Sequence, residues 1–163
     1  MRDVLAGVVV LVLLVTAASL GTTLQAYRRR RVRARDSENA LGRTIIAEIP
    51  VGDDLTLFSE DEARFYYGER SIDKDLIVAA RVLINGSPIA SYLSRHHLRS
   101  AERPPTTFDD RPEGIARDRW DVALETVTGT TIIECGAIRE RVSQELARAV
   151  FDAVKRDMER RDE

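Results

Sequence analysis

An uncharged run of 24 residues, Val4 to Tyr27, sets the first limit on how this chain can fold. At about 1.5 Å per residue, a helix of that length measures roughly 36 Å, which exceeds the hydrocarbon core of a bilayer at about 30 Å. A helix is also the only single segment that pairs its own backbone groups in lipid. The sequence therefore predicts an N-terminal single transmembrane α-helix, with residues 1–27 as a membrane anchor.

A cluster of six arginines directly follows this run: Arg28, Arg29, Arg30, Arg31, Arg33 and Arg35. Positive charge gathers on the cytoplasmic side of a span, and only Arg2 precedes the run. We therefore expect a single-pass protein of the bacterial inner membrane with its N-terminus outside and its C-terminal domain in the cytoplasm. The rival interpretation, a cleaved signal peptide, requires the positive charge before the apolar run.

The charge balance changes sharply after the arginine cluster. Residues 28–43 form a basic juxtamembrane neck and linker, in which each arginine near anionic lipid headgroups is worth about 1 kcal/mol of attraction. Residues 36–163 instead hold 18 basic and 26 acidic residues. A body this acidic is repelled by phosphate backbones. The expected partners are lipid headgroups at the neck and other proteins, and not nucleic acid.

Residues 44–163 are expected to form a β-rich α+β domain with mostly antiparallel strands. Asn85-Gly86 predicts a tight hairpin, because both residues tolerate positive φ. The polar stretch 71–75 is interpreted as a connection, and 94–118 as a long loop with three prolines. Alternating or apolar runs predict about seven strands, at 44–49, 55–58, 63–67, 76–84, 87–93, 120–127 and 130–135.

The end of the chain predicts a hairpin and then a helix. A turn at Thr128-Gly129 pairs Leu124 with Ile133 and Val122 with Cys135, so that the apolar faces of both strands coincide. Residues 138–160 follow as a long C-terminal helix that must cover a sheet. Its expected apolar stripe repeats every four residues: Ile138, Val142, Leu146, Val150 and Val154.

This order of elements over residues 44–160 resembles a pleckstrin-homology-like fold, in which two bent antiparallel sheets are capped by a final helix. The turn Gly52-Asp53-Asp54 between the first two strands is acidic. The resemblance therefore implies the fold, and the basic cluster needed to recognise a phosphoinositide is missing at that turn. The structural alternative is a plain α+β layer, with one antiparallel sheet and a helix across it.

The residues that most often carry chemistry have structural explanations here. The adjacent His96 and His97 point different ways in any regular element, and Cys135 falls on an apolar strand face. The pairs Asp53-Asp54 and Asp109-Asp110 lie where turns favour aspartate. The chain has no phosphate-binding glycine motif, no nucleophile elbow and no CxxC. We predict no catalytic, metal or cofactor-binding residue, and hence not an enzyme.

One strand offers a candidate interaction surface. Phe65, Tyr66 and Tyr67 stand next to one another, and alternation places Phe65 and Tyr67 on one face and Tyr66 on the other. At least one ring is then displayed at the surface, where aromatic residues are enriched in protein interfaces.

The expected function is that of a non-catalytic single-pass membrane protein whose cytoplasmic domain mediates protein–protein interaction. Its most concrete form is an accessory or assembly subunit of a larger inner-membrane complex, of respiratory or photosynthetic type, with other membrane-protein subunits as partners. The layout is similar to that of the H subunit of bacterial photosynthetic reaction centres. The alternatives are a membrane-tethered signalling or lipid-sensing module with a pleckstrin-homology-like domain, and a membrane-bound enzyme.

Overall fold

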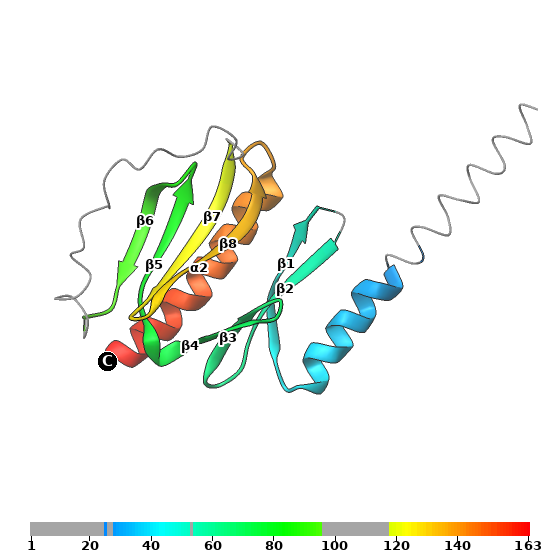
Figure 1. The fold of residues 1–163 in the computed structure, drawn as a ribbon, viewed down its shortest axis with the longest axis horizontal. Coiled ribbons are helices and arrows are strands. Elements are labelled where there is room, and N and C mark those ends of the chain that lie inside the picture. The colour runs from blue at the N-terminus through cyan, green and yellow to red at the C-terminus, as the bar shows by residue number, and fades with distance from the viewer. Residues whose placement is uncertain (1–24, 26–27, 53, 96–117) are drawn as a thin grey trace, which may run out of the picture. The chain divides into compact units, whose positions relative to one another are not determined.

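The computed structural model describes residue 25 and residues 28–52, 54–95 and 118–163 (Figure 1). The chain divides into two compact units, Met1–Leu41 and Gly42–Glu163. In the first unit, residues 28–40 are helical and all six arginines of the neck are exposed. The Leu41 N–H donates to the carbonyls of Ser37 and Glu38 at 3.2 and 3.1 Å. Gly42 follows with φ +72°, the left-handed conformation that ends many helices.

The transmembrane part of the expected fold class has no counterpart in the described chain. The expected span at residues 4–27 lies outside the described residues, apart from Gln25. Of the described helices, none combines the length and the apolar composition needed to cross a membrane. Residues 28–40 contain the arginines, and the C-terminal helix mixes charged with apolar residues. The expected fold class is therefore wrong, and the structure shows an α+β fold of two antiparallel sheets and a C-terminal helix.

The first sheet is a meander in the order β1-β2-β3-β4. Its strands are β1 (Thr44–Val51), β2 (Asp54–Glu60), β3 (Arg64–Tyr67) and β4 (Arg70–Asp73). Pro50 is tolerated because β1 is an edge strand, where a missing N–H leaves no ladder bond broken on the open side. The sequence missed β4, because Ile72 is its only large apolar residue. The Ile72 side chain is buried in the core, with 5% of its surface exposed, and the strand pairs with β3.

The second sheet has the order β6-β5-β7-β8. A short 3₁₀ helix, η1 (Lys74–Leu76), leads into β5 (Ile77–Ile84), and β6 (Ser87–Leu93), β7 (Arg119–Thr126) and β8 (Gly129–Ala137) follow. β5 lies between β6 and β7, so both of its edges are hydrogen-bonded within the sheet, and α2 packs on it. Its residues Ile77 to Ala80 and Val82 are buried, whereas Arg81 is half-buried. Asn85 and Gly86 have φ of 52° and 77°, as the hairpin prediction required. Most of the expected loop, residues 96–117, lies outside the described residues.

The number and arrangement of strands also correct the expected fold. Among the described residues there are eight strands in two four-stranded sheets, and not about seven. The single-layer alternative is excluded, since the two sheets contribute to one core. The pleckstrin-homology-like assignment is wrong together with the rest of the fold class. It rested only on the order of the elements along the sequence. In the second sheet the chain leaves β6 at the edge and returns on the far side of β5.

The hairpin of β7 and β8 has a different register from the expected one. The turn is at Val127-Thr128, so that Leu124 lies opposite Thr131 and Val122 opposite Ile133. The error is two residues, and a slip of two leaves every side chain on the same face of the sheet. Val122, Leu124, Ile133 and Cys135 are therefore all fully buried despite the wrong pairing.

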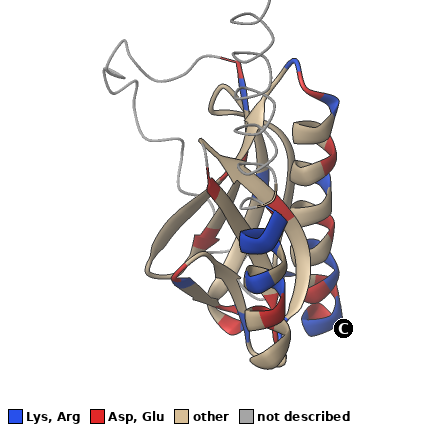
Figure 2. Cartoon of the chain, turned by 90° about the vertical axis from the view of Figure 1, so that its right-hand side faces the viewer, with Lys and Arg blue, Asp and Glu red and all other residues tan. Residues whose placement is uncertain are grey.

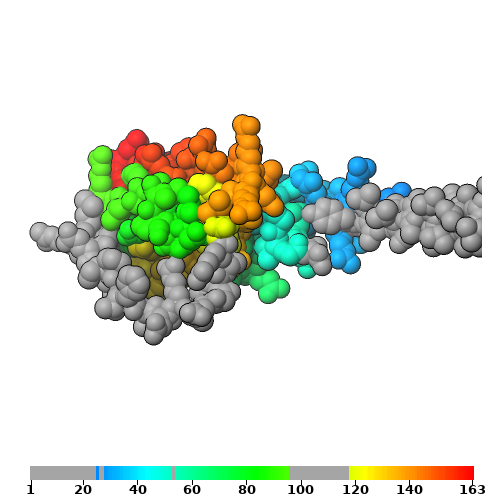
Figure 3. All heavy atoms as spheres, turned by 90° about the horizontal axis from the view of Figure 1, so that it is seen from above, coloured from blue at the N-terminus to red at the C-terminus, as the bar shows by residue number. Residues whose placement is uncertain are grey.

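The last element, α2 (Arg141–Asp162), packs on β5, β7 and β8 and also touches β1. It runs along one side of the second sheet, red to orange in Figure 3. The predicted apolar stripe is wrong at its N-terminal end. Ile138 lies in the turn before the helix, and Val142 is 60% exposed. The buried face is Ser143, Ala147, Val150, Ala153, Val154, Asp157 and Met158.

The core between the two sheets and α2 is continuous. Ile49, Phe58, Phe65 and Ile72 come from the first sheet, and the second sheet adds residues such as Leu124. Burying a side chain of this size contributes about 1.5–3 kcal/mol relative to leaving it in water. The two sheets and α2 therefore depend on the same set of contacts.

Candidate functional site

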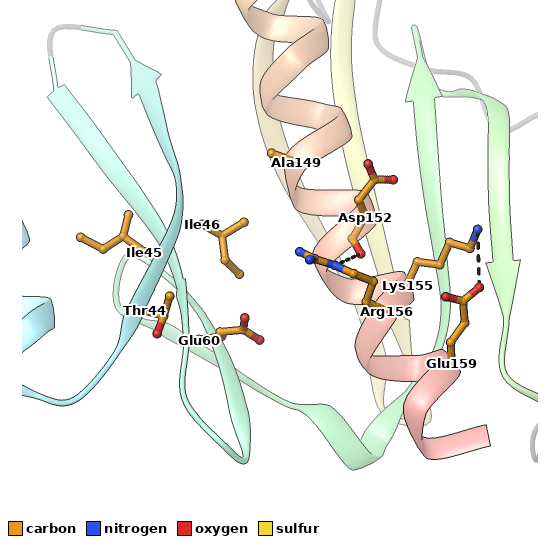
Figure 4. Close-up of a pocket in the computed structure, with 9 residues that line it drawn as sticks. All are labelled: Thr44, Ile45, Ile46, Glu60, Ala149, Asp152, Lys155, Arg156 and Glu159. Carbon is orange, nitrogen blue, oxygen red and sulfur yellow. Dashed lines mark hydrogen bonds and ion pairs between the residues drawn. The ribbon is translucent and has the colours of Figure 1, made fainter. Parts of the chain in front are cut away.

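A groove of about 580 Å³ lies between α2 and the first residues of β1 (Figure 4). Its lining comes from three elements: Thr44, Ile45 and Ile46 of β1, Glu60 of β2, and Ala149, Asp152, Lys155, Arg156 and Glu159 of α2. The volume is within the range of about 300–1,000 Å³ that is usual for ligand-binding pockets.

A β-bulge shapes the β1 wall of the groove. The register between β1 and β2 shifts between Ile45 and Ala47, which makes Ile46 the extra residue. Bulges re-aim side chains, and Ile46 points toward α2 while Ile45 points away from it (Figure 4). Ile46 also packs against the core and is thereby held in place. It supplies the apolar floor of the groove.

A buried lysine holds Glu60 on the same wall. Lys74 is only 4% exposed, and its Nζ lies 2.8 Å from Glu60 Oε2. The ammonium also donates to the Asp61 carbonyl at 2.7 Å and lies 4.6 Å from the centre of the Phe65 ring. A buried charge is tolerated only when it is paired and hydrogen-bonded, and these contacts meet that condition.

The same lysine connects the sheet to α2. Asp157 on the helix is 5% exposed, with its Oδ1 3.7 Å from Lys74 Nζ. Arg160 and Arg161 also pair with Asp157, at 2.5 and 2.9 Å. Lys74 thus lies between Glu60, which lines the groove, and Asp157, which is buried on α2 beneath it. The spacing of the two walls is fixed by this ionic cluster, Glu60, Lys74, Asp157, Arg160 and Arg161.

The helix wall presents Ala149 and Arg156 toward β1 (Figure 4). Arg156 Nε donates to the Asp152 carbonyl one turn earlier at 3.2 Å. Lys155 Nζ lies 3.5 Å from Glu159 Oε1, which places this cation in an ion pair along the helix. The groove therefore has an apolar floor between charged groups, the pattern of an interface with an apolar centre and a polar rim.

The acidic charge of the domain is unevenly spread. Residues 44–76 hold nine acidic and three basic residues, whereas α2 holds six basic and five acidic ones. Figure 2 shows both signs alternating along α2. Among the residues that line the groove, α2 contributes two acidic and two basic side chains, and the sheet contributes only Glu60.

The three aromatic residues predicted as an interaction surface do not share one surface. Phe65 is fully buried and stacks on Phe58, with ring centres 5.5 Å apart. Tyr67 is half-buried against the core. Tyr66 is half-buried, and the Arg43 guanidinium lies 3.5 Å from its ring centre. Phe65 contributes to the groove only indirectly, through its contact with Lys74.

Tyr66 is held by a hydrogen bond at the turn between β2 and β3. Its hydroxyl donates to Asp61 Oδ2 at 2.7 Å, while Asp61 Oδ1 accepts from the N–H groups of Ala63 and Arg64. The Tyr66 bond is the main reason that the pKa of Asp61 is lowered, and it raises the pKa of Tyr66. This cluster fixes the turn that carries Glu60 toward the groove.

The remaining candidates for chemistry are placed as follows. Burial, with a smaller contribution from the charge of Asp121, raises the pKa of the Cys135 thiol to about 12, so the thiolate needed for nucleophilic attack is scarce at neutral pH. Asp54 is exposed at the start of β2. His96, His97, Asp53, Asp109 and Asp110 lie outside the described residues. Within the described ranges, no three His, Cys, Asp or Glu side chains are grouped to hold a metal ion.

The sequence did not indicate the groove. Its lining residues are spread over 44–46, 60 and 149–159, and each segment reads as ordinary strand or helix. The one local signal is the adjacent pair Ile45-Ile46, which breaks the alternation of a regular strand and marks the bulge.

No family model, no curated protein and no solved structure matches the chain.

Proposed function

We propose that the domain of residues 42–163 is a non-catalytic protein-interaction module whose partner docks in the groove between β1 and α2. The observation that supports this most is the construction of the groove. A bulge directs Ile46 into it, and a buried ion cluster fixes the distance between its walls. A preformed groove binds a segment at a lower entropic cost than one that has to be assembled on binding.

The lining suits a polypeptide partner. Ile46 and Ala149 form an apolar surface that one side chain of a partner can cover, and charged residues surround it. In protein interfaces such apolar centres supply most of the affinity, while the surrounding polar groups exclude water and set orientation.

We further propose that this module works at the cytoplasmic face of a bacterial inner membrane, as an accessory or assembly subunit of a larger complex. This location is supported by the sequence, in which the uncharged run 4–27 is followed directly by six arginines. These arginines are exposed on the helix of residues 28–40, where they are accessible to anionic headgroups. Confinement near the bilayer raises the effective concentration of the module toward membrane partners.

Site-specific photo-crosslinking in cells tests the docking site. A photo-activatable phenylalanine analogue is placed in the full chain at Ala149, inside the groove, or at its neighbour Arg148, which is exposed on another side of α2. We expect one defined protein adduct from position 149 and none of that mass from position 148. No adduct from position 149, or the same adduct from both positions, would contradict the proposal.

A further inference from the structure

Arg156 differs from the other cations at the groove in having no carboxylate partner in the described part of the chain. Lys155 is paired with Glu159, and Lys74 with Glu60 and Asp157. Arg156 uses only its Nε, on a backbone carbonyl of its own helix. Its two terminal nitrogens are left for an incoming group, and the side chain is exposed.

The position of Arg156 relative to the apolar floor restricts what the incoming group can be. Figure 4 shows Arg156 and Ala149 on the side of α2 that faces Ile46. A guanidinium presents parallel N–H groups that match the two oxygens of a carboxylate. Glu60, on the opposite wall, does not cancel this preference, because Lys74 neutralises its charge at 2.8 Å.

We infer that the occupant of the groove is a partner segment with an Asp or Glu side chain next to an aliphatic side chain. The carboxylate binds Arg156, and the aliphatic group lies on Ile46 and Ala149. This inference rests on the proposed docking function and adds the chemistry of the partner. The fit is one of charge and polarity: a cation without a carboxylate partner in the described part of the chain lies beside an apolar floor, on a helix wall where the other lining cation, Lys155, is already paired with Glu159.

Selection from a displayed library of random peptides tests this chemistry. The full chain in detergent is the bait, as the wild type and as Arg156→Gln. Arg148→Gln, which removes an exposed arginine of the same helix outside the groove, is the matched control. We expect the wild type and Arg148→Gln to enrich peptides with Asp or Glu beside Leu, Ile or Val, and Arg156→Gln to lose that enrichment.

A double-mutant cycle then identifies the contact. In the best enriched peptide, Glu→Gln is expected to weaken binding to the wild type about tenfold, as loss of a charge-assisted hydrogen bond does, and to leave binding to Arg156→Gln unchanged. Equal weakening with both proteins would overturn the inference.

Ala149→Trp separates failure of the inference from failure of the proposed function, since a large ring fills the groove without changing its charges. If Ala149→Trp blocks the selected peptides but these lack a carboxylate, docking in the groove stands and the inference about Arg156 is wrong. If Ala149→Trp blocks none of them, the peptides bind elsewhere and both are wrong. Far-ultraviolet circular dichroism of each variant confirms that it is folded.

Discussion

At the scale of single residues, Lys74 is the side chain on which most of the groove depends. Its ammonium contacts Glu60 on the first sheet and Asp157 on α2, and it is almost fully buried. Pairing in a buried site offsets the cost of removing charges from water, but breaking such a pair leaves a charge uncompensated.

Replacing Lys74 with Met is expected to lower the free energy of unfolding by about 3 kcal/mol. This is the lower end of the range for breaking a buried ion pair, because Asp157 keeps Arg160 and Arg161 while Glu60 loses its partner. Lys155, the other lysine of the chain, is the matched control: Lys155→Met removes an exposed pair worth about 0.5 kcal/mol. Urea denaturation followed by the fluorescence of Trp120 measures both. Similar effects of the two substitutions would contradict the assignment of Lys74.

Cys135, the one cysteine, gives a prediction on pH. Burial raises its pKa to about 12 from an ordinary value of 9.0, so the folded chain retains the thiol proton over that interval while the unfolded chain loses it. Stability linked to Cys135 is therefore fully present below pH 9 and is lost as the pH rises toward 12. The urea midpoint should fall over this window in the wild type and less in Cys135→Val. An equal fall in both would show that other groups cause it.

At the scale of elements, the end of β8 makes a close contact with the start of α2. Gly136 has φ +111°, and a Cβ placed there would lie 2.5 Å from Ser143 Oγ on the first turn of the helix. Ser143 is itself buried and hydrogen-bonded to Glu140. Two separate penalties therefore act against any other residue at position 136: the backbone conformation and the steric clash.

A double-mutant cycle distinguishes these two penalties. Gly136→Ala is expected to cost about 2–4 kcal/mol of unfolding free energy from strain and overpacking together. Adding Ser143→Ala removes the oxygen at 2.5 Å and leaves the side-chain carbon at 3.4 Å, so part of the loss should return while the conformational part remains. Thermal and urea denaturation of the four proteins measure the coupling. Strict additivity would mean that Ser143 is not the obstacle.

The elements also show what the sequence could and could not reveal. Alternation located most strands, and Asn85-Gly86 marked its hairpin, since both signals depend on local chemistry. The two-residue error at the β7–β8 turn left the face of each side chain correct, because the sheet period is two. Strand β4 was missed because it contains only one large apolar residue, Ile72. The groove was missed because it depends on a bulge and on contacts between residues more than 80 positions apart along the chain.

At the scale of the whole molecule, both sheets and α2 share one core, and the groove lies where β1 separates from the helix. Membrane attachment through residues 4–27 remains a prediction from the sequence. If it is correct, the groove wall begins at Thr44, a few residues after the arginine neck along the chain. A partner segment close to the bilayer would then be the natural occupant.

The central claim, that a partner protein docks between β1 and α2, is tested most directly by size-exclusion chromatography of the full chain purified from its native membranes in mild detergent. We expect the wild type to elute with a defined partner as a complex, and Ala149→Trp to elute without it while remaining folded. A wild type that elutes alone at monomer size, or an Ala149→Trp variant that keeps its partner, would contradict the claim.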